Sequence, residues 1–167
     1  MAAMSRNKGK TGEREIAAIL ADLTGCRVQR RVRQRDGDSD LEGLPGWCVE
    51  VKRHARATRA SVATWWRQAV AQAEAAGGIP VLFWRQDRDE WRAVWPVATT
   101  LAMQRADMWT AYEWTAEGSI EAWAAIHRDL LVSPRPVAEI VTTARESMPV
   151  TVCRATPTAT NWRASDF

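Results

Sequence analysis

An acidic and a basic residue stand two positions apart near the middle of the chain, and a second acidic residue precedes them. If residues 47–52 form a strand, Glu50 and Lys52 leave the same face, because side chains alternate along a strand. Asp40 starts a neighbouring short segment and could join Glu50 from the other arm of a hairpin. Two carboxylates can hold Mg²⁺, while an ammonium group holds or polarises the attacking water. Such a set is suited to hydrolysis of a phosphodiester.

The same pattern also has a simpler interpretation. Glu and Lys at positions i and i+2 of a strand commonly form a solvated ion pair with no catalytic role. Asp36 and Asp38 compete with Asp40 as metal ligands, although their Gly- and Ser-containing turn favours solvated side chains. The surrounding secondary structure therefore helps to decide between a catalytic site and a solvated ion pair.

The first 60 residues contain the elements that would position this set. Apolar residues at helical spacing predict an amphipathic helix over residues 11–24, which Gly25 ends, and residues 1–10 are expected to be a flexible basic arm. A strand over 27–35 should lead into a turn. Two short strands, 40–42 and 47–52, should follow, joined by a Gly- and Pro-containing turn.

The next segment alternates between a helix and strands. Ser61 is expected to cap a helix that ends at Gly77 and Gly78, followed by strands over 79–84 and 91–97. Pro96 suggests that the latter strand lies at an edge or ends there. The order α, β, β, β, α, β, β predicts an α/β fold with a mixed central sheet flanked by helices.

Beyond residue 97 we expect a helical extension over 98–148, with helices near 98–115, 119–131 and 137–147, and a flexible tail over 149–167. The nuclease-like core with its arm would then be residues 1–97. Five of the tryptophans before this point are expected to be mostly core: Trp65, Trp66, Trp84, Trp91 and Trp95. In the extension Trp109, Trp114 and Trp123 are expected to pack, with stacking on unpaired bases or a subunit interface as the alternatives.

Positive charge is concentrated at the start of the chain. Residues 1–60 contain 13 Lys or Arg against 8 Asp or Glu, whereas residues 61–167 contain 10 against 12. The arginines of residues 27–35 suit a polyphosphate partner or, alternatively, protect a strand edge by charge. Three dispersed cysteines indicate neither disulfides nor a zinc site, and no apolar run approaches a membrane span. A soluble, cytoplasmic protein is expected.

Four ordered motifs resemble the archaeal-type Holliday junction resolvases of the PD-(D/E)xK nuclease superfamily. The basic segment Lys8–Glu15 resembles their N-terminal signature, and Asp40-Leu41 followed by residues 49–52 resembles their metal-binding core. Residues 77–82 and Trp91-Arg92 are similar to their second helix-to-strand passage and last strand. The resemblance covers about residues 6–97, and the segment after that departs from the family.

The resemblance implies a restriction-endonuclease-like fold and a role for individual residues. Asp40 and Glu50 would bind the metal, Lys52 would be the catalytic lysine and Glu13 the catalytic helix carboxylate. It also implies that Arg14 and Arg30 contact DNA, and we group with them the other basic residues of the arm and strand. The predicted DNA-binding set is Lys8, Lys10, Arg14, Arg30, Arg31 and Arg33.

Helix geometry offers a limited check on the helix carboxylate. At about 100° per residue, Glu13 lies roughly 70° from the centre of the apolar stripe and Glu15 roughly 90°. Either could border the sheet, so the choice of Glu13 rests mainly on the resemblance, and its alternative is a first-turn acid favoured by the helix dipole. His54 and His127 are separated in sequence, and we expect His127 to pack one turn after Trp123 rather than bind a metal.

These expectations combine into one function. The sequence predicts a Mg²⁺-dependent endodeoxyribonuclease, with Mn²⁺ able to substitute, that is selective for DNA structure. A Holliday junction resolvase acting in recombination and repair is favoured, and its symmetric substrate implies a homodimer joined through the second helix or through strand 91–97. The alternatives are a related nuclease acting on duplex, flap or foreign DNA, and a non-catalytic DNA-binding assembly protein.

Overall fold

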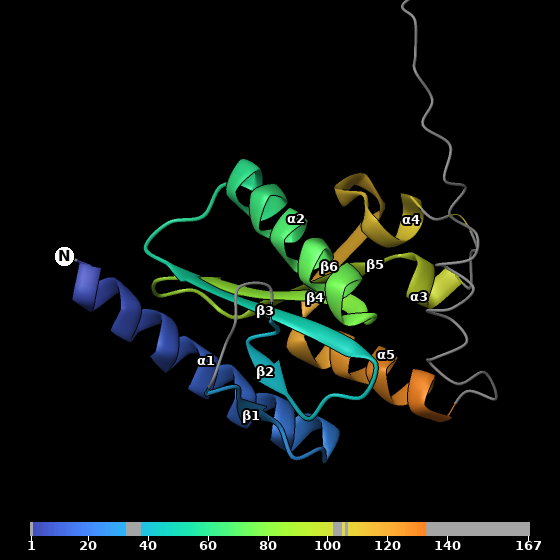
Figure 1. The fold of residues 1–167 in the computed structure, drawn as a ribbon, viewed down its shortest axis with the longest axis horizontal. Coiled ribbons are helices and arrows are strands. Elements are labelled where there is room, and N and C mark those ends of the chain that lie inside the picture. Colours follow the sequence, from blue (N-terminus) through green and yellow to red (C-terminus); the bar gives the residue numbers. More distant parts are fainter. Residues whose placement is uncertain (1, 33–37, 102–104, 106, 133–167) are drawn as a thin grey trace, which may run out of the picture.

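A mixed four-stranded sheet forms the centre of the protein in a computed structural model, which describes residues 2–32, 38–101, 105 and 107–132. Its strands are β3 (Trp47–His54), β4 (Ile79–Gln86), β5 (Arg92–Pro96) and β6 (Thr115–Ser119), in that order. β3 and β4 are parallel, whereas β4–β5 and β5–β6 are antiparallel. Helix α2 (Arg59–Ala76) covers one face, and α1 (Ala2–Thr24) and α5 (Ile120–Val132) lie on the other (Figure 1). The expected α/β architecture is confirmed.

The alternation of β3 separates two hydrophobic cores. Val49 and Val51 point into the larger core together with Phe83 of β4 and with residues of α1 and α5. Leu82 and Val94 point the other way, where they pack against the apolar side of α2. Glu50 and Lys52 alternate with the valines, so they share a face as the sequence predicted, and the structure shows that this is the α2 face.

A two-stranded antiparallel sheet carries the first half of the candidate site. It consists of β1 (Gln29–Arg30) and β2 (Leu41–Glu42) and is separate from the main sheet. The expected strand over 27–35 is thus reduced to two residues within the described range. The backbone amide of Asp40 donates to the carbonyl oxygen of Val49 over 2.8 Å, which joins this small sheet to β3.

Both long helices begin earlier than the sequence suggested. α1 starts at Ala2, so the expectation of a flexible arm over 1–10 is wrong, because residues such as Ala2, Ala3 and Met4 favour helix and no proline interrupts them. Gly25 ends α1 with a φ of 71°. α2 is capped by Thr58 rather than Ser61, because the extended backbone of Thr58 lets its side chain accept a hydrogen bond from the amide of Ser61.

The segment after β5 is not entirely helical, as we had expected. Short helices α3 (Ala98–Leu101) and α4 (Asp107–Thr110) and the 3-10 helix η1 (Tyr112–Trp114) lead into strand β6. β6 satisfies the outer backbone groups of β5, a long-range pairing that local periodicity cannot reveal. Pro96 ends β5 but does not mark an edge. The predicted helix over 137–147 and tail over 149–167 lie outside the described residues.

Helix α5 confirms the prediction made for 119–131 and packs against α1 and the sheet. Its Trp123 is fully buried and Trp109 is also buried, so packing is their role, whereas the Trp114 side chain is 37% exposed. His127 stacks on Trp123 with ring centroids 5.2 Å apart, which confirms the packed histidine. Across the described helices, none is both long and apolar enough to cross a membrane.

Candidate active site

Asp40 is held against the exposed edge of β3 by two backbone contacts. Its amide donates to the carbonyl oxygen of Val49, and its Oδ2 accepts a 2.7 Å hydrogen bond from the amide of Val51. These contacts bracket Glu50, the residue between the two valines. The carboxylate of Asp40 therefore reaches β3 at the level of Glu50 from the other arm of the hairpin, as the sequence predicted.

Glu50 is almost completely buried, with 2% of its surface exposed. Its Oε1 forms an ion pair with Nζ of Lys52, while its Oε2 is buried and has no hydrogen-bond partner among the described residues. The ion pair alone would fit the simpler interpretation of this pattern, but a solvated surface pair does not leave a carboxylate oxygen buried and unsatisfied. This oxygen indicates a ligand that the protein itself does not supply.

The electrostatic environment of Asp40 also indicates a missing ligand. Burial, the largest cause, together with the nearby charges of Glu50 and Glu13, raises the pKa of its carboxyl group from 3.8 to about 7. The hydrogen bond from Val51 and the charge of Lys52 lower the pKa but do not compensate. The ionised carboxyl group of Asp40 thus adds to a local excess of negative charge from Glu50 and Glu13, which Lys52 and the amide of Val51 do not offset.

A divalent cation would relieve this excess of negative charge. Within the described residues, no three Asp, Glu, His or Cys side chains already form a metal-binding group. Two carboxylates, one of which has an oxygen without a partner among the described residues, nevertheless suit Mg²⁺, which commonly binds one or two protein carboxylates and takes its other ligands from water and phosphate. The donor set of Asp40 and Glu50 therefore fits the expected cation.

Two acidic residues of α1 have different surroundings. Oε2 of Glu13 forms an ion pair with Nε of Arg30, and Glu13 is close enough to Asp40 to influence its pKa. Glu15 instead accepts two hydrogen bonds from Arg85, of 2.6 and 2.9 Å, and one of 3.1 Å from Nε1 of Trp91. Glu13 is thus directed toward the candidate site, whereas Glu15 ties α1 to β4 and to the start of β5.

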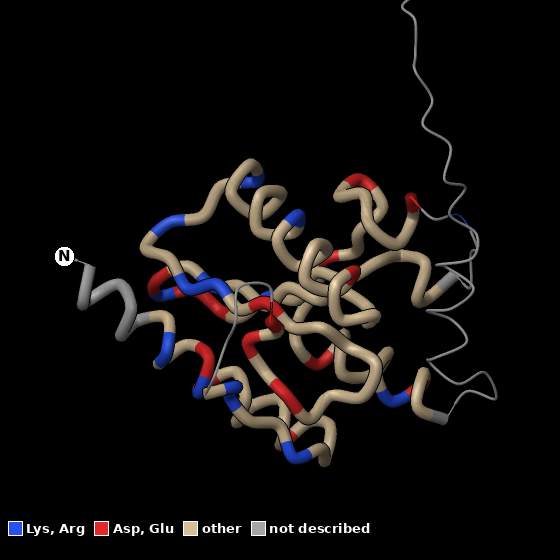
Figure 2. The backbone as a smooth tube through the Cα atoms, in the orientation of Figure 1, with Lys and Arg blue, Asp and Glu red and all other residues tan. Residues whose placement is uncertain are grey.

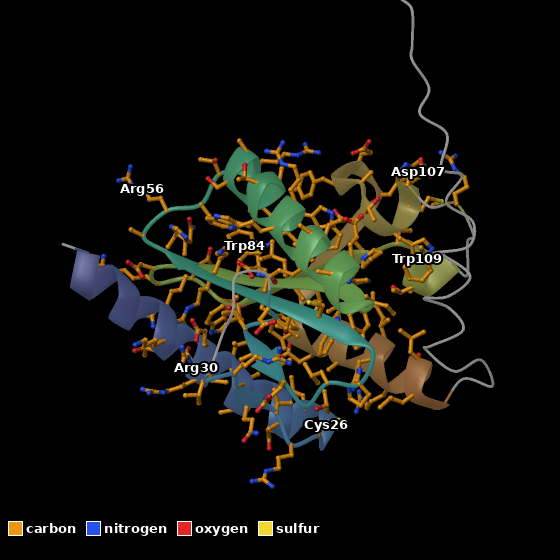
Figure 3. All side chains as sticks on the ribbon, in the orientation of Figure 1. Cys26, Arg30, Arg56, Trp84, Asp107 and Trp109 are labelled. Carbon is orange, nitrogen blue, oxygen red and sulfur yellow. The ribbon has the colours of Figure 1, made fainter. Side chains whose placement is uncertain are left out.

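The predicted DNA-binding residues are placed differently from one another. Lys10 and Arg14 are exposed on α1, whereas Arg30 pairs with Glu13 and Arg31 lies within 4 Å of the carboxylates of Asp38 and Glu42. Arg33 and the side chain of Lys8 lie outside the described residues. Figure 2 shows further Lys and Arg along the end of β3 and the loop that follows it. Figure 3 shows Arg30 beside α1 and Arg56 pointing outward from that loop.

Ser39 is a structural residue that sequence reasoning missed. We expected it in a solvated turn, but it is buried, and its Oγ accepts a 2.9 Å hydrogen bond from the amide of Val49. The same hydroxyl donates to the carbonyl oxygen of Leu41 over 2.7 Å. Ser39 therefore replaces regular strand pairing between β2 and β3. Its position directly before Asp40 is the only signal of this role in the sequence.

Cys48 shares the face of Glu50 and Lys52 and is buried. Burial raises the pKa of its thiol to about 11, so the thiol stays protonated and unreactive at neutral pH. A pocket of about 310 Å³ opens beside it and is lined also by Arg31, Asp38 and Ser39. Because Gly77 and Gly78 line it too, this pocket lies at the C-terminal end of α2.

The chain is similar to several known proteins. Residues 4–121 match a family described as "Phage putative PDDEXK endonuclease". Protein D14 of Escherichia phage T5 is 27% identical over 113 residues, which cover 54% of this chain and 70% of that protein. Among solved structures, Archaeoglobus fulgidus Hjc, a Holliday junction resolvase from an archaeal hyperthermophile, is 17% identical with a TM-score of 0.40, covering 72% of this chain and 88% of Hjc. The match over residues 4–121 spans more than half of the sequence and includes every element of the candidate site, so the chain belongs to this family of PDDEXK endonucleases.

Proposed function

We propose that this protein is a Mg²⁺-dependent, structure-selective DNA endonuclease that cleaves four-way junctions as a homodimer. The observation that carries the nuclease part is the buried, unpartnered Oε2 of Glu50 beside Asp40 and Lys52. Family membership supports the same chemistry. The choice of a four-way junction is supported by the ordered resemblance of residues 8–92 to junction resolvases.

Each residue of the site has a distinct part in the proposed mechanism. When bound by Asp40 and Glu50, Mg²⁺ would supply a nucleophilic water and neutralise charge on the phosphoryl and leaving oxygens. Lys52 holds the attacking water or a phosphoryl oxygen through its ammonium group, which the ion pair with Glu50 orients. Asp40 acts in its ionised form, and the hydrogen bond from Val51 keeps its carboxylate in place.

Glu13 and Arg30 form the outer border of the proposed site. The ion pair joins α1 to β1 next to Asp40, so α1 is positioned relative to the metal-binding carboxylates. Lys10 and Arg14, exposed on the same helix, would contact DNA phosphates. The dimer would place two such sites on the symmetry-related strands of a junction.

The tryptophans of the second helix and the strand 91–97, which we expected at the interface, are covered within the protein itself. Trp65 and Trp66 of α2 are buried in the protein's own core, and β5 is flanked on both sides by β4 and β6. A homodimer would therefore not be joined through these two tryptophans or through an edge of β5. Analytical ultracentrifugation of the free protein and of its junction complex measures this directly.

A cleavage panel tests the proposed function. The full chain is incubated with four-way, flapped and linear DNA of matched sequence, with Mg²⁺ or with EDTA. We expect paired cuts in the four-way junction that require Mg²⁺. Equal cutting of the linear duplex would overturn the resolvase assignment, and binding without cleavage of any substrate would identify a non-catalytic DNA-binding protein.

A further inference from the structure

A second pocket, of about 420 Å³, lies at the N-terminal end of α2, opposite the one beside Cys48. Its walls come from the first turn of α2, from β4, from η1 and from β6. Trp84 and Tyr112 supply the aromatic surface, and Arg59, Glu113 and Glu117 supply the charged groups. None of these residues belongs to the candidate active site.

Strand register connects this pocket to the active site. Lys52 of β3 is the direct partner of Trp84 on β4, and Trp84 is in turn the partner of Arg92 on β5. Directly paired residues place their side chains on the same face of a sheet. The pocket wall formed by Trp84 is therefore one strand away from Lys52 and faces the same way, and Figure 3 shows Trp84 on the α2 side of the sheet.

Aromatic rings continue from the end of β3 to this wall. His54, two residues after Lys52, stacks on Trp65 with centroids 4.6 Å apart and an interplanar angle of 25°. Trp65 in turn lies 6.4 Å from Trp84. Trp65 itself is buried, so a nucleic acid strand that passes Lys52 would meet the exposed His54 and the half-buried Trp84, and aromatic rings of this kind can stack on unpaired bases.

The polar groups of the pocket suit the edge of a base. Nη1 of Arg92 donates to Oε1 of Glu117 over 3.3 Å, and its guanidinium lies 6.0 Å from the centre of the Trp84 ring. Glu113 is exposed in the pocket wall. Carboxylates accept hydrogen bonds from the exocyclic amino groups of bases, whereas they would repel a phosphate group. Arg59 provides the cation that a flanking phosphate requires.

We propose that this pocket receives one unpaired nucleobase of the DNA strand held at Lys52, with the base stacked on Trp84 and its polar edge turned toward Glu113 and Glu117. The inference rests on the proposed function, because that function makes DNA the ligand. It adds a source of selectivity, because a fully stacked duplex cannot offer a base to the pocket without the cost of unstacking it. Branched DNA with open or flapped bases offers one more readily.

Fluorescent DNA can test this inference without cleavage. Two probes of the same sequence carry 2-aminopurine, one at an unpaired flap position next to the branch and one in fully paired duplex, and binding is measured in EDTA. Tyr112→Ala removes one pocket wall, and Ala57→Leu fills the pocket while leaving the aromatic residues in place. Trp114→Ala is the matched control, because Trp114 is an exposed aromatic residue of η1 that does not line the pocket.

We expect the unpaired probe to be quenched on binding to the wild-type protein and to Trp114→Ala. Both pocket variants should lose this quenching and bind the unpaired probe between about fivefold and a hundredfold more weakly, the effect of one stacked base. Their affinity for the paired probe should be unchanged, which excludes misfolding. Wild-type quenching that is absent, or that persists in both pocket variants, would overturn the inference, as would an equal loss of affinity for both probes.

The results of this experiment distinguish a failure of the base-pocket inference from a failure of the proposed nuclease function. If the wild-type protein quenches the unpaired probe but shows no Mg²⁺-dependent cleavage, the nuclease proposal is refuted and the base pocket is retained. Junction cleavage by the wild-type protein, with pocket variants that bind both probes normally, would leave the nuclease and remove the pocket.

Discussion

The backbone amide of Val51 donates a 2.7 Å hydrogen bond to Oδ2 of Asp40, which aligns a carboxylate from the β1–β2 sheet with Glu50 on β3. Both carboxylates are largely shielded from water, and Lys52 forms an ion pair with Glu50. The protein therefore maintains a concentration of negative charge that costs stability until a cation binds. The following predictions depend on this arrangement and on the elements that create it.

Asp40→Asn should stabilise the metal-free protein at pH 8. The pKa of Asp40 is about 7 in the folded protein against 3.8 as its ordinary value, so the folded state resists ionisation. Below about pH 4 the carboxyl group of Asp40 is protonated in both the folded and the unfolded protein. As pH rises from about 4 to about 7, Asp40 ionises more readily in the unfolded protein, and the free energy of unfolding falls. Asparagine keeps an acceptor for the amide of Val51 but carries no charge. Thermal melts in EDTA should show that the free energy of unfolding of the variant is higher by a few kcal/mol at pH 8 and that this gain disappears near pH 4. A variant less stable than the wild type at pH 8 would contradict the pKa assignment.

Glu50→Gln should lower cleavage by more than about a hundredfold, because the amide cannot replace a carboxylate as a metal ligand. DNA affinity in EDTA should remain near that of the wild type, since the predicted phosphate contacts come from Lys10 and Arg14 on α1. Single-turnover cleavage and anisotropy binding measure the two effects. Glu74→Gln, an exposed change on α2, is the matched control. Persistent cleavage by Glu50→Gln would refute the assignment of the site.

Glu13→Gln and Glu15→Gln should separate catalysis from stability. Glu13 is close enough to Asp40 to influence its pKa, so its loss should lower the cleavage rate by about tenfold to a hundredfold with little change in melting temperature. Glu15 binds Arg85 and Trp91, and its side chain is one third exposed. Its loss should therefore lower the free energy of unfolding by about 1 kcal/mol. Rates and melts of both variants at one pH test this. The reverse pattern would assign the site carboxylate to Glu15.

Gly43→Ala should destabilise the protein more than Gly25→Ala, although both glycines have positive φ angles. A Cβ atom on Gly43 would lie 2.0 Å from the carbonyl oxygen of Arg27, whereas nothing lies within 4 Å of one on Gly25. We expect a loss of at least about 2 kcal/mol for Gly43→Ala and about 1 kcal/mol for Gly25→Ala. Because β2 follows Asp40 directly, Gly43→Ala should also slow cleavage. Equal melting temperatures would contradict the close approach of this turn to residue 27.

Several elements could be predicted because their signals are local. The glycines at positions 25 and 77 end their helices with left-handed backbone angles, and the alternation of β3 separates the valines from Glu50 and Lys52. The helix cap was misplaced by three residues, because Thr58 and Ser61 both suit a cap and only the backbone angles distinguish them. The strand β6 was missed because residues 115–119 have little apolar alternation, and their pairing with β5 supplies the stabilisation.

By itself, the sequence determined the residue types of the candidate site and the face of β3 on which Glu50 and Lys52 lie, because strand alternation depends only on neighbouring residues. The tertiary structure decided that Glu13, not Glu15, approaches Asp40, because that choice depends on how α1 is tied to β4 and β1 by Arg85 and Arg30. It also decided that the Glu50 carboxylate is buried with an unpartnered oxygen. Burial and charge balance result from contacts between segments far apart in the chain, and no local pattern encodes them.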